Sequence, residues 1–324
     1  MKILVTGGAG YIGSHFVRIL MKNNIEVVVL DNLSRGHKES IPENVIFENA
    51  DLLNYEQLER VLKKYSFDAI VHFAAFAYVG ESVEKPELYY ENNVVGSFNL
   101  IKATLNANIN KFVFSSTCSL YGNPKEIPIS EKLPTNPINP YAQTKLIIEN
   151  ILRDFDRAYG IKSVFLRYFN AAGADFSGEI GESHQPEPHL IPIVLNTALG
   201  KREKVFIFGD DYETEDGTCI RDYIHINDLG NAHLRALEYL DNGGNTDVIN
   251  LGTGEGYSVK EIIATAEKVT GVKIKAEITK RRKGDPAILV ADNKKAKEIL
   301  GWKPEYNLND IISSAYNWHK SPRF

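Results

Sequence analysis

Cysteine is scarce in this chain, and long apolar runs are absent. The 324 residues include only two cysteines, Cys118 and Cys219, far apart in the sequence. They offer neither a disulfide framework nor a cysteine metal cluster, so we expect a reducing, cytoplasmic environment. No segment approaches the ~18 apolar residues of a membrane span. The apolar run before the first glycines is too short for a signal peptide.

Positive charge is not in excess either. The chain has 37 lysines and arginines against 42 aspartates and glutamates, a net charge of −5. Nucleic-acid binding calls for a basic face, so we expect no nucleic-acid partner. No His-x-x-x-His pair stands in a metal-site context, and we therefore expect no metal. What remains is an ordinary globular composition, with a length typical of about two domains.

Apolar runs and helical patterns alternate along the first half of the chain. Strand patterns occur at 2–6, 26–30, 45–49, 69–75, 111–116 and 163–169. Helical patterns occur between them, at 11–23, 54–65, 86–108 and 140–159. Strands that alternate with helices form a parallel, doubly wound sheet.

The amino-acid composition changes after Phe169, where a stretch rich in glycine, proline and acidic residues begins. Such composition is typical of a transition between domains. We therefore predict an α/β fold: a Rossmann-like doubly wound parallel sheet with a smaller C-terminal α/β substrate domain. The predicted cofactor-binding domain comprises 1–169 and is rejoined by about 224–251, and the substrate domain comprises 170–223 and 252–324.

A glycine-rich turn, TGGAGYIG, joins the first strand to the first helix. Gly7, Gly10 and Gly13 permit a tight turn, close approach of a pyrophosphate and packing of helix on strand. The helix N-terminus offers free N–H groups and a positive dipole end to the diphosphate. Asp31 ends the second strand, where a carboxylate binds ribose hydroxyls and repels a 2′-phosphate. The pattern predicts NAD rather than NADP; Arg35 nearby is a counter-signal.

Further cofactor candidates end the third and fourth strands. Asp51 follows the third strand and could approach the adenine or cap a helix. Phe73, Ala74 and Ala75 end the fourth strand, where small residues leave room for a cofactor or simply pack.

Tyrosine is followed four positions later by lysine in three places, Tyr121–Lys125, Tyr141–Lys145 and Tyr316–Lys320. A Gly-Asn-Pro turn follows Tyr121, and Tyr316 is far from any cofactor motif. Tyr141 begins a predicted helix behind a capping Asn-Pro pair, so Lys145 shares its face. A nearby cation lowers a tyrosine pKa from about 10 toward that of a usable general base. Tyr141 and Lys145 are therefore the candidate catalytic pair.

Thr117 follows the strand pattern 111–116 at the carboxyl edge of the predicted sheet. Its hydroxyl is suited to bond the oxygen that Tyr141 deprotonates. Since threonine at a strand end is more often a cap, its assignment depends on Tyr141.

Sequence motifs along the whole chain support a resemblance. In order they are TGGAGYIGSH, LDNLSRG, YYENNVVGS, FSSTCSLYG, NPYAQTK, LRYFNAAGA, EDGTCIRDYIH and RRKGDP. With these motifs the chain resembles the extended short-chain dehydrogenase/reductases, and more narrowly the UDP-glucose 4-epimerase family. The resemblance implies C4 inversion of a UDP-hexose through a 4-keto intermediate with bound NAD, in a homodimer. Tyr141 is then the base, Thr117 its hydroxyl partner and Lys145 the cation that also holds the nicotinamide ribose.

The resemblance also assigns binding residues. With the glycine turn and strand ends, the expected cofactor contacts are Gly7, Gly10, Tyr11, Ile12, Gly13, Asp31, Asn32, Asp51, Leu52, Phe73, Ala74, Ala75, Asn92, Tyr141, Lys145 and Phe169. The expected nucleotide-sugar contacts are Thr117, Asn170, His189, Leu190, Phe206, Phe208, Arg221, Tyr223, Arg282, Asp285 and Leu289. Arg221 and Arg282 come from separate segments and suit a diphosphate.

Other functions stay open. Leu289 stands where family members limited to unacetylated hexoses tend to carry a bulky aromatic, so UDP-N-acetylglucosamine or a UDP-pentose is an alternative substrate. A related nucleotide-sugar 4,6-dehydratase would carry an acidic pair after the threonine, where this chain has Cys118 and Ser119. A nonenzymatic NAD-binding sensor would keep the glycine turn but would not need Tyr141 and Lys145.

Overall fold

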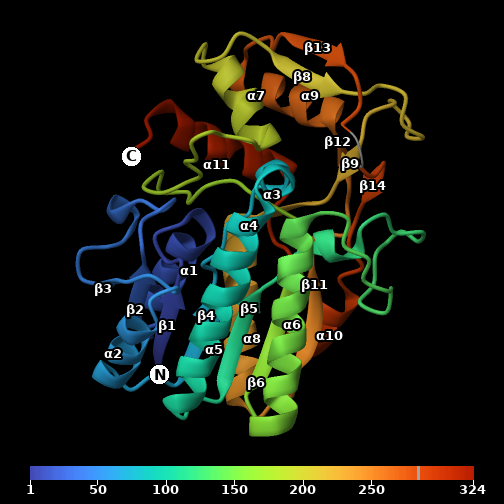
Figure 1. Ribbon diagram of the computed structural model, residues 1–324. Helices are drawn as coiled ribbons and strands as arrows, with labels where there is room; N and C mark the ends of the chain where they lie inside the picture. The colour runs from blue at the N-terminus through green and yellow to red at the C-terminus, as the bar shows by residue number, and fades with distance from the viewer. Residues whose placement is uncertain (283–284) are drawn as a thin grey trace.

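A seven-stranded sheet forms the larger part of the computed structural model, which describes residues 1–282 and 285–324 (Figure 1). Its strands are β1 (Lys2–Thr6), β2 (Glu26–Asp31), β3 (Ile46–Asn49), β4 (Ala69–His72), β5 (Lys111–Ser115), β6 (Lys162–Tyr168) and β11 (Asp247–Leu251). They are all parallel, in the order β11-β6-β5-β4-β1-β2-β3. The chain winds outward from β1 in one direction and then, from β4, in the other. The predicted doubly wound parallel sheet is confirmed.

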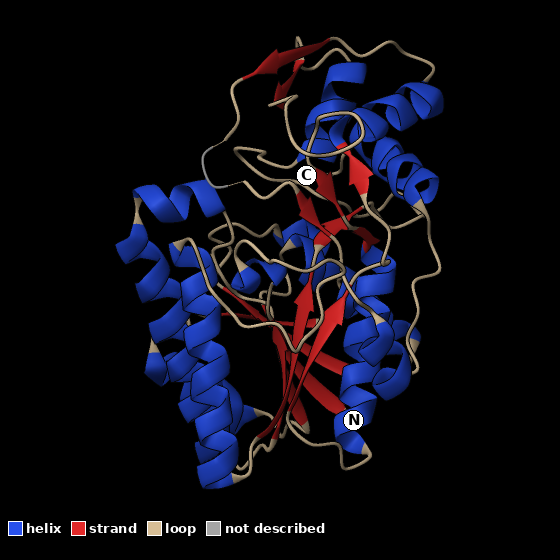
Figure 2. Cartoon of the chain, turned by 90° about the vertical axis from the view of Figure 1, so that its right-hand side faces the viewer, coloured by secondary structure: helices blue, strands red, loops and turns tan. Residues whose placement is uncertain are grey.

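Helices cover both faces of this sheet, which Figure 2 shows between two helical layers. One layer contains α1 (Tyr11–Lys22), α8 (Ile226–Asp241) and α10 (Lys294–Leu300). The other contains α2 (Tyr55–Lys64), α5 (Gly96–Asn106) and α6 (Pro140–Tyr159).

The alternation of side chains in β1 explains the two layers. Ile3 and Val5 join the core that includes Phe16 of α1, whereas Leu4 joins the core that includes Leu58 of α2. Successive residues of a strand point to opposite faces, so a strand buried on both faces is apolar throughout. Burial on both faces explains why the central residues of β1, in the segment KILVT, form a continuous apolar run.

A second group of elements lies above the carboxyl ends of the strands (Figure 1). The helices α7 (Leu190–Ala198), α9 (Val259–Thr270) and α11 (Leu308–Lys320) pack around a third core. The short strands here are β8 (Val205–Phe208) with β13 (Ala276–Thr279), β7 (Asn170–Ala172) with β10 (Tyr223–His225), and β9 (Ile220–Arg221) with β12 (Tyr257–Ser258) and β14 (Ile288–Leu289). The exact domain boundaries stay a prediction.

The predicted helix at 86–108 is one continuous helical stretch with three geometries. It comprises α4 (Pro86–Tyr89), a π-helical segment η2 (Tyr90–Val95) and α5. The shorter elements are α3 (Val79–Glu84), η1 (Lys38–Ser40) and η3 (Cys118–Tyr121). Among the described residues, no helix has the length and apolar character needed to span a bilayer.

Candidate active site

A cavity of about 440 Å³ opens where the strands of the large sheet end, beneath the loop that leads to α7. Every predicted cofactor contact lines it, from Gly7 at the turn after β1 to Phe169 beyond β6. The predicted substrate contacts that line it are Thr117, Asn170, His189, Leu190 and Tyr223. The parallel sheet therefore brings the glycine turn and the candidate catalytic pair into one cavity, at the edge where doubly wound folds bind ligands.

The glycine turn has no room for side chains at two positions. Gly7 has a positive φ of 71°, and a Cβ there would lie 2.5 Å from the backbone nitrogen of Ala74. A Cβ on Gly13 would lie 2.2 Å from the carbonyl oxygen of Gly7. Because neither residue has a side chain, the turn can lie against Ala74 after β4, and α1 can begin directly against the turn that follows β1.

The N-terminus of α1 is free to bind an anion. Gly10 is the N-cap residue and has no side chain with which to cap the helix. The first hydrogen bond of the helix runs from the backbone N–H of Ser14 to the carbonyl of Gly10, at 2.9 Å. The first N–H groups of a helix have no partner within it. Those of α1 belong to residues 11–13, which line the cavity. This arrangement fits the diphosphate of a dinucleotide.

Asp31 is 8% exposed at the end of β2 and is held in place by its own turn. Its carboxylate accepts hydrogen bonds from the backbone N–H of Ala9 at 3.0 Å and of Leu33 at 2.8 Å. Burial raises the pKa of Asp31, while these two N–H groups favour the carboxylate. A carboxylate oxygen accepts more than one bond, so Asp31 retains acceptor capacity for ribose hydroxyls.

Arg35, the counter-signal in the sequence, is already occupied by protein groups. Its guanidinium pairs with Glu81 and lies 4.2 Å from the centre of the Phe76 ring and 4.5 Å from that of Tyr78. A 2′-phosphate would have to compete with this carboxylate. The arrangement therefore favours NAD.

The candidate catalytic residues lie together on the opposite wall of the cavity. Tyr141, in the first turn of α6, is 7% exposed, and the Thr117 side chain lies close enough to favour its phenolate. The backbone N–H of Ser119 donates to the Thr117 oxygen at 3.2 Å, which leaves the hydroxyl hydrogen for Tyr141. Lys145, one turn along α6, donates to the carbonyl of Ser115 at 2.8 Å.

The expected pKa shift of Tyr141 is reversed in this structure. Burial raises the pKa of Tyr141 well above its usual range, and the Thr117 side chain offsets only part of that effect. Burial also lowers the pKa of Lys145 to about 7. The Lys145 nitrogen lies 6.0 Å from the centre of the Tyr141 ring and bonds to Ser115 instead. The expectation that Lys145 lowers the pKa of Tyr141 was wrong for this structure, because spacing along a helix says nothing about desolvation. The role of Tyr141 as the base stays a prediction.

The other two Tyr-x-x-x-Lys pairs do not line the cavity. Tyr121 is 2% exposed, and its hydroxyl donates to Asn250 at 2.7 Å and accepts from Arg167 at 3.0 Å. Tyr316 lies on α11, with the Lys320 nitrogen 4.3 Å from its ring centre. The pair that context along the sequence favours, Tyr141 and Lys145, is thus the one that lines the cavity.

Cys118, next to Thr117, has no acidic character. It is 8% exposed, and burial raises the pKa of its thiol to about 12. A dehydratase needs an acid at this place, so the geometry disfavours that alternative.

Asn92 reaches the cavity from the π-helical segment. Its fully buried neighbour Asn93 bonds both backbone groups of Phe76, at 2.8 and 3.0 Å, and donates to Thr144 of α6 at 3.2 Å. The wider turn of a π-helix thus presents two consecutive asparagines to different partners.

The remaining predicted substrate contacts lie beyond the cavity lining. Arg221 on β9 pairs with Asp285 from a segment 64 residues away, and the Arg282 guanidinium lies 4.0 Å from the Phe208 ring centre. Leu289 pairs with Arg221 in the β9–β14 register and packs against the cluster of Cys118 and Phe169. Phe206 precedes Phe208 on β8. Their roles in substrate binding stay predictions.

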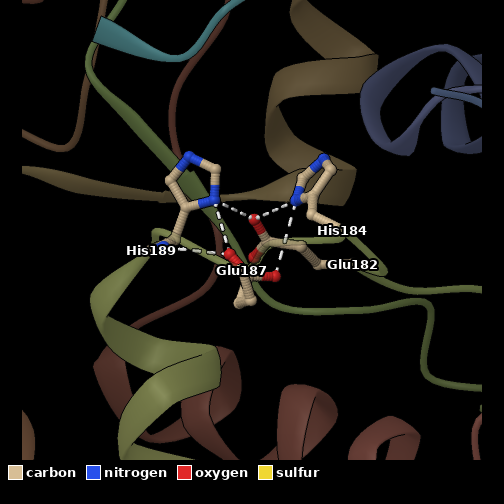
Figure 3. A group of neighbouring side chains, drawn as sticks. All are labelled: Glu182, His184, Glu187 and His189. Carbon is tan, nitrogen blue, oxygen red and sulfur yellow. Dashed lines mark hydrogen bonds and ion pairs between the residues drawn. The ribbon is translucent and has the colours of Figure 1, made fainter. Parts of the chain in front are cut away.

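Glu182, His184, Glu187 and His189 form a cluster (Figure 3), of which all but Glu187 line the cavity. His189 is a predicted substrate contact, whereas the sequence reasoning missed the other three and the cluster as a whole. Burial opposes charge on the imidazoles, but the two carboxylates outweigh it and raise the pKa of His184 to about 9 and of His189 to about 10. The spacing Glu-x-His-x-x-Glu-x-His was the available signal. This spacing lies in a proline-containing stretch that the sequence analysis interprets only as a transition between domains.

Comparisons with known proteins agree with this geometry. Residues 3–252 match the model of the NAD dependent epimerase/dehydratase family. A Halalkalibacterium halodurans protein named UDP-glucose 4-epimerase is 54% identical over 321 residues, covering 99% of this chain and 96% of that protein.

Two solved structures are similar over nearly the whole chain. The UDP-glucose 4-epimerase of Brucella ovis in complex with NAD has a TM-score of 0.95 and 47% identity, with 97% of each chain covered. The UDP-Glc/GlcNAc 4-epimerase of Campylobacter jejuni has a TM-score of 0.87 and 46% identity, covering 98% of this chain and 99% of that one.

Proposed function

The chain belongs to the NAD dependent epimerase/dehydratase family, and we propose that it interconverts UDP-glucose and UDP-galactose by inversion at C4. The observation that carries the proposal is the placement of Thr117, Tyr141 and Lys145 in the same cavity as the glycine turn and Asp31. A phenol beside a dinucleotide-binding turn is suited to take a proton from a hydroxyl while the carbon that bears it is oxidised.

The residues present fit NAD. The uncapped N-terminus of α1 suits the diphosphate, and Asp31 suits the adenosine ribose. A bound nicotinamide dinucleotide would supply the acceptor of the C4 hydride in its oxidised form and the donor in its reduced form. The Lys145 ammonium has three donors, one of which is held by Ser115, so two remain for the nicotinamide ribose.

Tyr141 takes the proton of the C4 hydroxyl, and the neighbouring Thr117 hydroxyl is suited to donate a hydrogen bond to the tyrosine oxygen. The resulting 4-keto sugar turns over in the cavity, and Tyr141 returns the proton when C4 is reduced from its opposite face. Because burial opposes the phenolate, proton transfer has to coincide with charge changes in the cavity rather than precede them. Positive charge from bound NAD⁺ and Lys145 favours this transfer.

The UDP moiety is assigned to the second group of elements. Arg221 and Arg282 supply guanidinium groups for the diphosphate, while Asn170 and Asp285 suit hydroxyl groups. In this division 1–169 with about 224–251 binds NAD, and 170–223 with 252–324 binds the nucleotide sugar. Firm binding of the nucleotide leaves the sugar free to turn.

Purified protein incubated with UDP-galactose, without added NAD, tests the proposal. We expect UDP-glucose to form until equilibrium, and NAD(H) to be released when the protein is denatured. A preparation that holds NAD but never converts either sugar would rule out the epimerase and leave a nonenzymatic NAD-binding protein.

A second candidate substrate pair is UDP-N-acetylglucosamine and UDP-N-acetylgalactosamine. The Campylobacter jejuni structure similar to this chain is named for both UDP-Glc and UDP-GlcNAc. In this chain Leu289 occupies the position that the sequence analysis connects with this choice. Parallel assays of the hexose pair and of the N-acetylhexosamine pair decide whether the enzyme accepts one pair or both.

Assembly and location belong to the same proposal. Tyr90, Val95 and Phe98, of η2 and α5, and Tyr159 of α6 are 39%, 48%, 42% and 59% exposed. These apolar side chains on neighbouring helices suit a helix-bundle homodimer. Two free cysteines in the described residues suit a cytoplasmic protein. Light scattering of the wild type and of Phe98→Glu tests the dimer.

A further inference from the structure

The loop between β7 and α7 brings two histidines and two glutamates together (Figure 3). The candidate ligand atoms of Glu182, His184, Glu187 and His189 all lie within 4.8 Å of one another. Glu182 is 5% exposed, and the side chains of His184 and Glu187 are 17% and 15% exposed. The His189 side chain is 48% exposed, so three members of the cluster are largely withdrawn from solvent and the fourth is open to it.

The separations approach those of a tetrahedral metal site. The Nδ1 atom of His189 lies 2.7 Å from a Glu182 oxygen and 2.9 Å from a Glu187 oxygen. The Nδ1 atom of His184 lies 3.2 and 3.5 Å from oxygens of the same two residues. Bonds of about 2.0–2.2 Å to tetrahedral zinc separate its ligand atoms by about 3.3–3.5 Å. The two Glu187 contacts use different oxygens of its carboxylate, and the four ligand atoms all lie within 4.8 Å of one another. Binding an ion would therefore widen the shortest contacts by up to about 0.8 Å and shorten the longest by up to about 1.5 Å.

A second observation also points to a ligand. The Nδ1 atom of His184 is buried and has no hydrogen-bond partner among the described residues, although two carboxylates lie nearby. The nearest oxygens of the two carboxylates lie 3.2 and 3.5 Å from this nitrogen without meeting the geometry of a hydrogen bond. In the described part of the chain, neither Glu182 nor Glu187 pairs with a lysine or an arginine. The two imidazoles are the cationic partners of both carboxylates, and Glu187 also accepts the backbone N–H of His189 at 2.9 Å.

The donor set selects the ion. Two imidazole nitrogens and two carboxylate oxygens suit zinc in four-fold coordination, whereas magnesium and calcium require six or more oxygens. Two carboxylates, two neutral imidazoles and one divalent cation sum to zero charge, so the buried site needs no further counter-ion. Four protein ligands close the coordination sphere, which is typical of structural rather than catalytic zinc.

We propose that Glu182, His184, Glu187 and His189 bind one zinc ion that cross-links the two ends of this loop segment beside the cavity. His189 is the residue at which α7 begins, and the Glu182 carbonyl accepts a bond from the Trp318 indole of α11 at 2.9 Å. The ion would thereby connect α7 and α11 through one short loop. The proposal runs against the expectation of no metal and does not depend on the epimerase proposal.

Metal binding by untagged protein tests the site. The protein is dialysed against a chelator and titrated with Zn²⁺ in competition with a chromophoric indicator, and separately with Co²⁺. We expect one equivalent of zinc, strong visible bands typical of tetrahedral Co²⁺, and a rise in the unfolding temperature on zinc addition. His184→Gln and Glu187→Gln should each weaken zinc binding by at least about 10–100-fold, the loss seen when only an outer partner is removed.

His37→Gln is the matched control, because the His37 ring contacts the Ser183 carbonyl of the same loop at 3.2 Å without belonging to the cluster. It should keep the zinc stoichiometry and the cobalt spectrum. Circular dichroism and bound NAD(H) show whether each variant is folded. Equal zinc affinity in wild type, His184→Gln and Glu187→Gln would overturn the proposal. No saturable equivalent in the wild type would also overturn it and leave a proton-bridged cluster.

Discussion

The two halves of the cleft are built in different ways. The half at the carboxyl ends of the central strands takes its residues from the ends of those strands and from the helices α1, α6 and η2 that pack beside them. Every predicted cofactor contact there lines the cavity. The half beneath α7 takes its residues from loops and two- or three-residue strands. Several of its predicted contacts, including Arg221 and Leu289, lie outside the lining.

The difference follows from how each half is held together. Parallel pairing brings all strand ends to one edge, so the cofactor half is positioned by the core of the sheet. The nucleotide-sugar half depends on contacts between distant segments, such as the pair of Arg221 and Asp285. We therefore expect changes in the first half to affect NAD alone, and changes in the second to affect the UDP-sugar alone.

Tyr141→Phe, at the junction of the halves, should have the largest effect. It removes the proton acceptor and leaves the ring in its buried place, so turnover should fall by about 10²–10⁴-fold. Binding of NAD and UDP should be retained. Steady-state rates with UDP-galactose, together with isothermal titration with UDP, measure the two effects separately.

Tyr121→Phe is the matched control for this prediction. It removes a hydroxyl bonded to Asn250 and Arg167, so it should lower the free energy of unfolding by about 1–3 kcal/mol without a comparable loss of turnover. Near-normal turnover in Tyr141→Phe, or an equal loss in both variants, would exclude Tyr141 as the base.

Local patterns in the sequence predicted the sheet and the cofactor half, because strand alternation, glycine spacing and helix capping are local properties. The glycine turn, Asp31 and the Tyr141 helix are examples. The reversed pKa of Tyr141 was not predictable, because it depends on burial by elements distant in sequence. The cluster at 182–189 was missed for a similar reason: the fold of its loop brings together side chains whose spacing matches no standard metal motif.

Arg221→Gln should have the next largest effect, confined to the nucleotide-sugar half. Hydrogen bonds to charged groups contribute about 1.5–3 kcal/mol, so the Kd for UDP should rise by about 10–150-fold. NAD content should not change. The control is Arg281→Gln, which removes a 43% exposed guanidinium paired with Asp211. Equal UDP affinity in wild type and Arg221→Gln would remove Arg221 from the diphosphate site.

Asp31→Asn should have a smaller effect, confined to the cofactor half. The amide oxygen still accepts a hydrogen bond, so NAD binding should weaken by only about 0.5–1.5 kcal/mol. Affinity for NADP should stay low because Glu81 still holds Arg35.

Adding Glu81→Gln to Asp31→Asn should release Arg35 and improve NADP binding relative to the single variant. Fluorescence titration with both dinucleotides measures the preference. If the single and double variants have the same NADP affinity, the pair of Arg35 and Glu81 does not contribute to cofactor choice.

Leu289→Tyr should have the smallest effect, on substrate range alone. A direct pocket contact is worth about 1–3 kcal/mol of discrimination. Leu289 does not line the cavity and acts indirectly, because it packs against Phe169 and Cys118 beside it. We therefore expect the ratio of the two activities to change only a few-fold. The larger ring should push this cluster toward the sugar and lower the ratio of N-acetylhexosamine to hexose turnover.

Leu289→Ala is the opposite change and should raise that ratio, since it removes side-chain volume from the same cluster. Both ratios are measured at saturating substrate, so that loss of folded protein affects numerator and denominator equally. Identical ratios in the wild type and both variants would show that substrate range is set elsewhere. The first place to look would then be the part of the cavity wall formed by Asn170 and Tyr223, which line it directly.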